Sequence, residues 1–234
     1  RRVYRVAVRL GEGRDSADAE GTACGASGGG PTEGQLRAVL PARTGNIMRV
    51  PPVFCARKVG GERAYDRARA GRPPELPPRP ARVDRFELID RPDADTAVFE
   101  VESGKGVYMR SLARDVALAA GTVGHITVLR RLRVGPFVEA DAIMLDKLAP
   151  NDENAPASAD LLCPVETALA DIPALALTTD EAVLLRHGQK LGLFGLEGRI
   201  PPTDEQGTLR VMEGERVLGI GRLEDGWLKP VRML

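Results

Sequence analysis

A cation stands at an unusual place in residues 98–111, VFEVESGKGVYMRS. The SGKG of residues 103–106 is a tight basic turn with two flexible glycines, and the apolar residues after it recur every three or four positions, as in a helix. Arg110 is therefore predicted in the first turn of a helix, where the positive end of the helix dipole disfavours a cation. An arginine at such a position is usually held by an acid or a phosphate, but a solvated surface arginine fits this stretch equally well.

Charge is unevenly distributed along the chain, although the formal net charge is zero. Residues 43–85 contain eleven Arg or Lys and four acids, whereas residues 139–180 contain nine acids and a single Lys. A concentration of positive charge of this kind indicates a surface that faces a polyanion. Independently solvated faces would give the same bias, so charge alone leaves both interpretations open.

Metal chemistry and histidine-based activation of a nucleophile have few candidate residues. The chain has three scattered cysteines without a C-x-x-C pair, and its only histidines, His125 and His187, lie far apart. This pattern predicts neither a zinc site nor a disulfide framework, and it favours a reducing, cytoplasmic location. The acids of residues 11–21 lack the spacing of a calcium loop and are predicted to lie in a solvated loop. No apolar run approaches the length of a membrane span.

Alternation of apolar and polar residues predicts the strands that position these groups. Residues 2–10 (RVYRVAVRL) have one basic and one apolar face, as in a strand with one side on a core. Residues 82–89 alternate as well and are predicted to pair with residues 98–102 across the loop 91–95. Residues 125–129 form a short apolar strand after the central helix.

The basic block consists of short elements that glycine and proline separate. A capped helix is predicted over residues 32–40, followed by a proline-bounded turn over residues 45–52 and a strand over residues 53–59. The glycine pair 60–61 predicts a hairpin-like turn, and residues 64–70 predict a basic helical turn.

The acidic, proline-containing segment near residue 150 predicts a domain boundary. A short helix is expected over residues 140–148. A short helix capped near Thr178 or Thr179 and three β-patterned segments then suggest a small barrel. The predicted division is a large domain of residues 1–149, a linker of residues 150–172 and a small domain of residues 173–234.

Four motifs, in this order and spacing, resemble the bacterial tRNA pseudouridine synthase B family, which isomerises the uridine of the tRNA T-loop. They are VYRV with LGEGRDSADAEG in residues 3–21, PPVFCARKVGGERAYDRARAG in residues 51–71, SGKGVYMRSLARD in residues 103–115 and VLRRLRVGPF in residues 128–137. The match covers about residues 1–148, and the tail is similar to that family's RNA-binding domain of PUA type.

The resemblance implies an α+β protein with the pseudouridine synthase fold, a mixed, largely antiparallel sheet with flanking helices, plus a small β-barrel-like PUA-type domain. It implies an isomerase that uses an Asp nucleophile and no metal or organic cofactor. In the implied reaction the uridine is flipped out of the RNA and its glycosidic bond is cleaved. The base is then rejoined to the sugar through a carbon atom. The implied partner is the T-arm stem-loop of tRNA, and the protein is expected to be a monomer without membrane association.

The resemblance also assigns residues. By position in the motifs, the catalytic residues are Tyr4, Arg110 and Leu129, with Arg110 pairing the catalytic Asp. The substrate-binding residues are Tyr108, Lys58, Lys105, Arg67 and Arg69, and no metal ligands are expected.

The nucleophile of the family lies in a G-x-L-D-like motif upstream of the strand that holds Tyr4, and this chain begins after that point. Asp15, Asp18 and Asp115 do not stand in such a motif, so no nucleophile is assigned. We therefore expect an N-terminally truncated chain that is inactive by itself. The alternative is a non-catalytic protein that grips tRNA with the same fold.

Overall fold

The computed structural model describes residues 1–28, 30–145, 161–204 and 206–234, which form two compact units. Unit 1 comprises Arg1–Val134 with Val138–Ala140, and unit 2 comprises Gly135–Phe137 with Asp141–Leu234. Each unit is built around its own apolar core. Much of the predicted linker of residues 150–172 lies outside the described residues, and a short helix, α4 (Val165–Ala168), is found in its last part.

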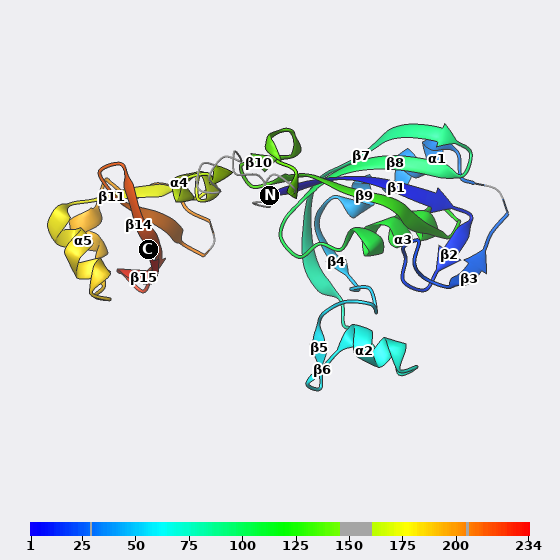
Figure 1. Ribbon diagram of the computed structural model, residues 1–234, viewed down its shortest axis with the longest axis horizontal. Coiled ribbons are helices and arrows are strands. Elements are labelled where there is room, and N and C mark those ends of the chain that lie inside the picture. Colours follow the sequence, from blue (N-terminus) through cyan, green and yellow to red (C-terminus); the bar gives the residue numbers. More distant parts are fainter. Residues whose placement is uncertain (29, 146–160, 205) are drawn as a thin grey trace, which may run out of the picture. The chain divides into compact units, whose positions relative to one another are not determined.

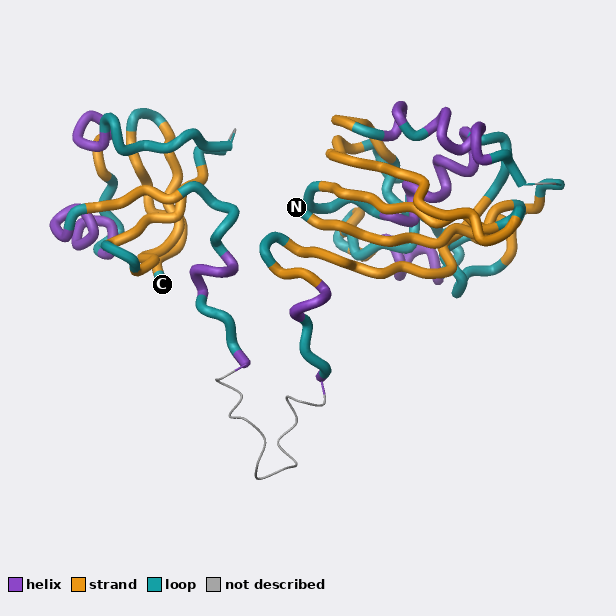
Figure 2. The backbone as a smooth tube through the Cα atoms, turned by 90° about the horizontal axis from the view of Figure 1, so that it is seen from above, coloured by secondary structure: helices purple, strands orange, loops and turns teal. Residues whose placement is uncertain are grey.

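Unit 1 is built on a six-stranded sheet with the order β10-β9-β1-β8-β7-β4 (Figures 1 and 2). Its strands are β1 (Arg2–Leu10), β4 (Gly45–Arg49), β7 (Arg79–Asp93), β8 (Thr96–Ser103), β9 (Gly124–Val134) and β10 (Phe137–Val138). β1 pairs antiparallel with both β8 and β9, and β7 pairs with β8 as the alternation predicts.

Helix α3 (Met109–Ala119) covers one face of this sheet. The left-handed Gly106 (φ 84°) ends the basic turn before it, and the left-handed Gly121 (φ 81°) follows its last turn. Its buried side chains, including Leu112, pack against strand residues such as Phe99, which is 1% exposed. Burying one such side chain contributes roughly 1.5–3 kcal/mol. A Cβ at Gly124 would lie 2.8 Å from the Arg9 carbonyl oxygen, so a glycine is required there.

Smaller elements of unit 1 surround the sheet. Helix α1 (Glu33–Val39) has the predicted Thr32 cap, completed by Gln35, and is followed by the 3-10 turn η1 (Pro41–Arg43). The remaining short elements are β2 (Glu12–Arg14), β3 (Ala23–Ala26), β5 (Lys58–Val59), β6 (Glu62–Arg63) and α2 (Ala64–Arg69). In Figure 1, β5, β6 and α2 extend together from one end of the six-stranded sheet.

Unit 2 has a five-stranded sheet with the order β11-β13-β14-β15-β12, in which β11 is parallel to β13 and the other pairs are antiparallel. Its elements are β11 (Ala174–Leu177), α5 (Thr179–Arg186), β12 (Leu191–Gly192), η5 (Leu193–Leu196), β13 (Thr208–Glu213), β14 (Arg216–Glu224) and β15 (Trp227–Met233). Of the two cap residues that the sequence allows, Thr178 caps α5, and it forms a capping box with Glu181.

Several predicted boundaries were wrong. Residues 45–49 form the edge strand β4 rather than a turn, because pairing with β7 satisfies their backbone groups. In the predicted strand over residues 53–59, only Lys58–Val59 is a strand. The predicted helix over residues 140–148 is described only as far as residue 145. Its start lies in the 3-10 turn η2 (Glu139–Asp141), and no α-helix is found within the described residues 140–145.

Candidate active site

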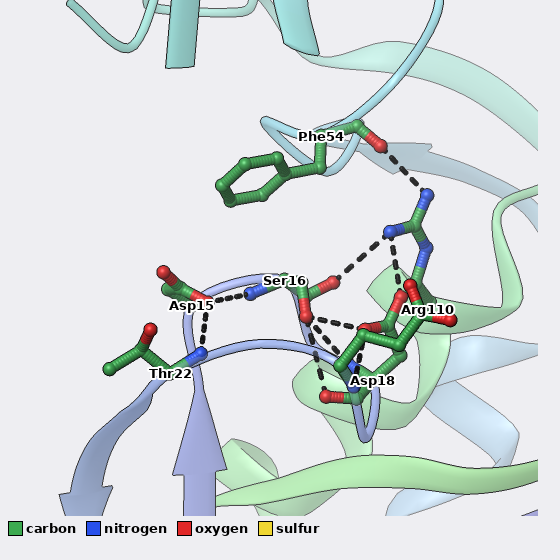
Figure 3. A network of polar contacts seen from close by, with 7 residues as sticks. Asp15, Ser16, Asp18, Thr22, Phe54 and Arg110 are labelled. Atoms are coloured by element: carbon green, nitrogen blue, oxygen red, sulfur yellow. Dashed lines mark hydrogen bonds and ion pairs between the residues drawn. The ribbon is translucent and has the colours of Figure 1, made fainter. Parts of the chain in front are cut away.

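Arg110 joins three separate segments of unit 1 (Figure 3). It lies in the first turn of α3, and its Nη1 donates to Asp18 Oδ2 at 2.9 Å and to the Ser16 carbonyl oxygen at 3.3 Å. Its Nη2 donates to the Phe54 carbonyl oxygen at 2.7 Å. Of the alternatives that the sequence leaves open for Arg110, the structure shows an acidic partner, Asp18. The implied pairing of Arg110 with the catalytic Asp stays a prediction.

Asp18 is held through both carboxylate oxygens. Oδ2 accepts from Arg110, while Oδ1 accepts from the Ser16 hydroxyl at 2.5 Å and from the Glu20 backbone N–H at 3.2 Å. Hydrogen bonds to both oxygens of a carboxylate fix its orientation. Asp18 is thus a fixed counter-ion for Arg110.

The loop between β2 and β3 is shaped to present Asp18. At its base, Asp15 Oδ1 accepts from the backbone N–H groups of Ser16 at 2.7 Å and Thr22 at 2.9 Å. Ala17 has a left-handed φ of 60°, and a Cβ at Gly21 would lie 2.2 Å from Ser16 Oγ. Backbone strain of this kind persists only where the surrounding contacts determine the conformation.

A cavity of about 620 Å³ lies over this cluster. We call it the Arg110 pocket, and its lining includes Asp18, Arg110, Phe54, Tyr65 and Arg69. Two aromatic rings beside charged and hydrogen-bonding groups are a combination that can stack and orient a nucleobase.

Tyr4 and Leu129 lie on the sheet face that α3 covers. Tyr4 is 5% exposed and belongs to the same core as Met109, and the Arg131 guanidinium carbon lies 5.3 Å from its ring centre. Leu129 pairs with Val6 and so points to the same side, yet it is 51% exposed. Tyr4 thus lies inside the core and Leu129 at an open part of the same face.

Tyr108 connects α3 to a second, smaller apolar cluster. It occupies the N-cap position of α3 and packs against Cys55, Ala64 and Leu76. Burial, reinforced by the neighbouring Cys55, raises the pKa of the Tyr108 hydroxyl above its ordinary value. The hydroxyl is therefore neutral at physiological pH.

Lys58, Arg67 and Arg69 lie together in the segment formed by β5, β6 and α2. The Arg67 guanidinium donates to the Val59 carbonyl at 3.5 Å, and the Arg69 guanidinium carbon lies 5.5 Å from the Tyr65 ring centre. Lys58 is exposed. Of these three cations, Arg69 also lines the Arg110 pocket.

Lys105 lies elsewhere, in the turn before α3. It is exposed and lines a different cavity, of about 260 Å³, together with Tyr108. The predicted site residues therefore fall into four places: the Arg110 pocket, the sheet face under α3, the segment around α2 and this second cavity.

Sequence reasoning missed Asp18, Ser16 and Phe54 as members of the cluster. The prediction of a solvated acidic loop was wrong for its centre, because Ser16 is 8% exposed and the Asp18 side chain 28%. The usable signal was Asp15 and Asp18 flanking a serine, since such side chains often accept hydrogen bonds from their own loop. Phe54 contributes only its carbonyl to Arg110, which side-chain type cannot reveal.

Within the residues that the structure describes, no group of three or more His, Cys, Asp or Glu side chains is placed to hold a metal ion. No helix in the same ranges is both long and apolar enough to cross a bilayer.

Three protein families match successive parts of the chain. Residues 1–109 match the N-terminal domain of TruB family pseudouridylate synthases, residues 110–170 match the C-terminal domain of tRNA pseudouridylate synthase B, and residues 173–234 match the C-terminal domain of pseudouridine synthase II TruB. A tRNA pseudouridine synthase B of Gluconacetobacter diazotrophicus is 65% identical over 99% of this chain and 76% of its own length. The chain belongs to the TruB family. The predicted family and enzyme class, a pseudouridine synthase and hence an isomerase, are confirmed.

Further comparisons agree with this membership and test the fold. A second TruB relative, from Gluconobacter oxydans, is 54% identical over 99% of the chain and 72% of its own length. The structure of a Cbf5-Nop10-Gar1 complex matches with a TM-score of 0.69 at 20% identity, over 100% of this chain and 65% of the matched chain. The predicted pseudouridine synthase fold with a PUA-like C-terminal domain is confirmed.

Proposed function

We propose that this TruB-family protein converts a uridine in the T-loop of tRNA to pseudouridine without a metal or organic cofactor. The observation that carries the proposal is the Arg110 cluster, which holds a guanidinium in a fixed orientation beside a cavity that can take a base. The name tRNA pseudouridine synthase B on relatives of 65% and 54% identity supports tRNA as the substrate.

Arg110 orients the nucleophilic carboxylate in this proposal. A guanidinium has five N–H donors, and its three printed contacts use three of them. Two donors are left for a further anion, and the planar fork of arginine fits a carboxylate with two parallel hydrogen bonds. Asp18 acts as a positioning residue, because both of its oxygens are already engaged. No residue of this chain is assigned as the nucleophile.

The remaining predicted residues act on the base and on the RNA backbone. Flipping a base out of its stack costs a few kcal/mol, which apolar and aromatic contacts in the pocket offset. From their positions in the family motifs we assign contacts with the flipped base to Tyr4, Leu129 and Tyr108, although none of the three lines the Arg110 pocket. Lys58, Lys105, Arg67 and Arg69 contact phosphates of the T-arm.

Residues 1–149 are the catalytic domain in this proposal, residues 150–172 the linker and residues 173–234 the PUA-like RNA-binding domain. The protein acts as a monomer in the cytoplasm.

Conversion of a T-arm transcript, detected by mass spectrometry after chemical derivatisation of pseudouridine, tests the proposal. The intact protein should convert one uridine in the presence of EDTA, and a transcript with cytidine at that position should give no product; residues 1–234 alone, in which no nucleophile is assigned, should give none with either transcript. The alternative of a non-catalytic RNA-binding protein predicts that both transcripts bind and that neither is modified. Binding without conversion by the full-length protein would therefore replace the proposed activity with the alternative.

A further inference from the structure

A second cationic pocket lies beside the Arg110 cluster but shares none of its polar contacts. It is the cavity of about 260 Å³ between the end of β4, the start of β7 and the turn before α3. Its charged lining residues are Arg49, Arg57, Arg79 and Lys105, and no acid lines it. We call it the Arg49 pocket.

Arg49 is buried beneath this pocket without adequate partners. The residue is 6% exposed, and its Nη2 lies 2.8 Å from Asp115 Oδ2. None of its three side-chain nitrogens makes a hydrogen bond of acceptable geometry within the described part of the chain. Asp115 is also shared with Arg114 at 3.0 Å, so a single carboxylate serves two guanidinium groups. A buried polar group without hydrogen bonds costs free energy, and a buried charge costs more.

The pairing of the strands adds to this excess of positive charge. Arg49 on β4 and Arg79 on β7 stand directly opposite each other, and like charges in that relation are destabilising. Burial, only partly offset by Asp115, lowers the pKa of Arg49 to about 10. An anion in the pocket would relieve both the repulsion and the unmet charge of Arg49.

The exposure of the cations divides their roles. The Arg49 nitrogens are covered from water, so this residue acts as a fixed charge under the floor of the pocket. Arg79 and Lys105 are exposed and can reach a ligand directly, and Arg57 is partly exposed. Three reachable cations over a fixed one suit a backbone phosphate, whose two non-bridging oxygens share one negative charge and can each accept several hydrogen bonds.

We propose that the Arg49 pocket binds one backbone phosphate of the RNA substrate. The proposal rests on the proposed function for the identity of the RNA. Tyr108 lines the pocket two residues before Arg110, so a phosphate held there would fix the strand close to the residue that orients the chemistry.

The test combines a protein variant with RNA in which single phosphates are neutralised. Arg79→Gln removes one reachable cation, and T-arm stem-loops with one methylphosphonate each remove one phosphate charge. Arg37→Gln is the matched control, because Arg37 is an exposed arginine of the same unit that pairs with its own acid, Glu33, at 2.8 Å.

Arg79→Gln should weaken binding of the unmodified stem-loop several-fold and lower the slope of log affinity against log salt by about 1. At one methylphosphonate position, the loss of affinity caused by the RNA change and that caused by Arg79→Gln should not be additive, because both remove the same contact. Arg37→Gln should leave the affinity unchanged at every position. A melting temperature of Arg79→Gln at or above that of the parent would show that the variant is folded.

Additive losses at every methylphosphonate position, or an unchanged salt slope, would overturn the proposal. Titration with inorganic phosphate alone tests whether the pocket binds a free phosphate ion instead of an RNA phosphate. If inorganic phosphate binds in an Arg79-dependent manner while the RNA losses are additive, the pocket serves a free anion and the RNA assignment is wrong. Pseudouridine formation by the parent is scored separately, so a failure of the proposed activity and a failure of the phosphate contact give different results.

Discussion

Two arginines that contact α3 or lie in it differ in how their charge is satisfied. Arg110 donates to three oxygens and leaves its side chain 25% exposed, whereas Arg49 is 6% exposed and has one ion pair without a hydrogen bond of acceptable geometry among the described residues. The first arrangement fixes a side chain in place. The second costs stability, which is expected where a protein retains a charge for a ligand rather than for its own fold.

The partners of the two arginines explain the difference. Asp18 is placed by a closed loop with its own hydrogen bonds, so it is available to Arg110 in one orientation. Asp115 lies on α3 and interacts with both Arg49 and Arg114. Arg110 has an acid of its own, which fixes the orientation of its guanidinium. Arg49 shares Asp115 with Arg114, so one carboxylate faces two positive charges.

The largest expected effect is that of Arg110→Lys on turnover. Lys keeps the charge but cannot join Asp18, the Ser16 carbonyl and a further carboxylate in one plane. A reacting group misplaced by about 1 Å can cost on the order of a hundredfold in rate. Single-turnover rates at saturating enzyme should fall by about that factor, with nearly normal RNA affinity.

Arg114→Lys is the matched control for this measurement, because Arg114 lies on the same helix and pairs with Asp115 instead. It should react at close to the parental rate. A parental rate for Arg110→Lys under these conditions would mean that Arg110 does not orient the nucleophile.

Asp18→Asn should have a smaller effect of the same kind, about tenfold on the single-turnover rate. The amide keeps the size of the carboxylate but removes the charge that holds Arg110 at 2.9 Å. In the double variant Asp18→Asn, Arg110→Lys the two losses should not add, because both act through the orientation of one guanidinium. Full additivity would show that Asp18 acts independently of Arg110.

Replacing Arg67 and Arg69 with Ala tests the segment around α2, where the expected effect is on binding. Phosphate contacts release counterions, so each lost contact should lower the salt slope by roughly 0.9 and weaken T-arm affinity several-fold. Arg69 also contacts the Tyr65 ring, so Arg69→Ala alone should weaken T-arm affinity more than Arg67→Ala alone. An unchanged slope in the double variant would indicate that this segment is a solvated face.

The sequence predicts much of the frame that holds the two arginines. Alternation located β1, β7 and β8, and cap residues located α1 and α5, because these signals are local. The position of Arg110 in a first helical turn also indicated an acid or a phosphate as a partner, with a solvated arginine as the alternative. The family assignment followed from four motifs in order, which together are a stronger signal than any one of them alone.

What the sequence could not predict depends on contacts between distant segments. Asp18 meets Arg110 across 92 positions, and a carbonyl of residue 54 completes the cluster, which leaves no trace in side-chain type. In the sequence, Arg49 cannot be distinguished from the other cations of the basic block. Only the pairing of β4 with β7 places it opposite Arg79. Residues 45–52 were predicted as a turn, and this error concealed that pairing.

The smallest expected effect concerns the stability cost of Arg49. Its pKa in the folded protein is lowered to about 10, well below that of the unfolded chain, so between the two pKa values the unfolded chain binds more protons than the folded one. Stability contributed by this group therefore rises with pH in that window, and the cost is fully present below about pH 10. Relative to Arg49→Met, the parent should gain on the order of 1 kcal/mol of unfolding free energy between pH 9 and pH 11. Urea unfolding of both proteins at the two pH values measures the difference, in which the other titrating groups cancel. An identical pH response would mean that the guanidinium of Arg49 is as well accommodated as that of Arg110, and the contrast between the two arginines would then be lost.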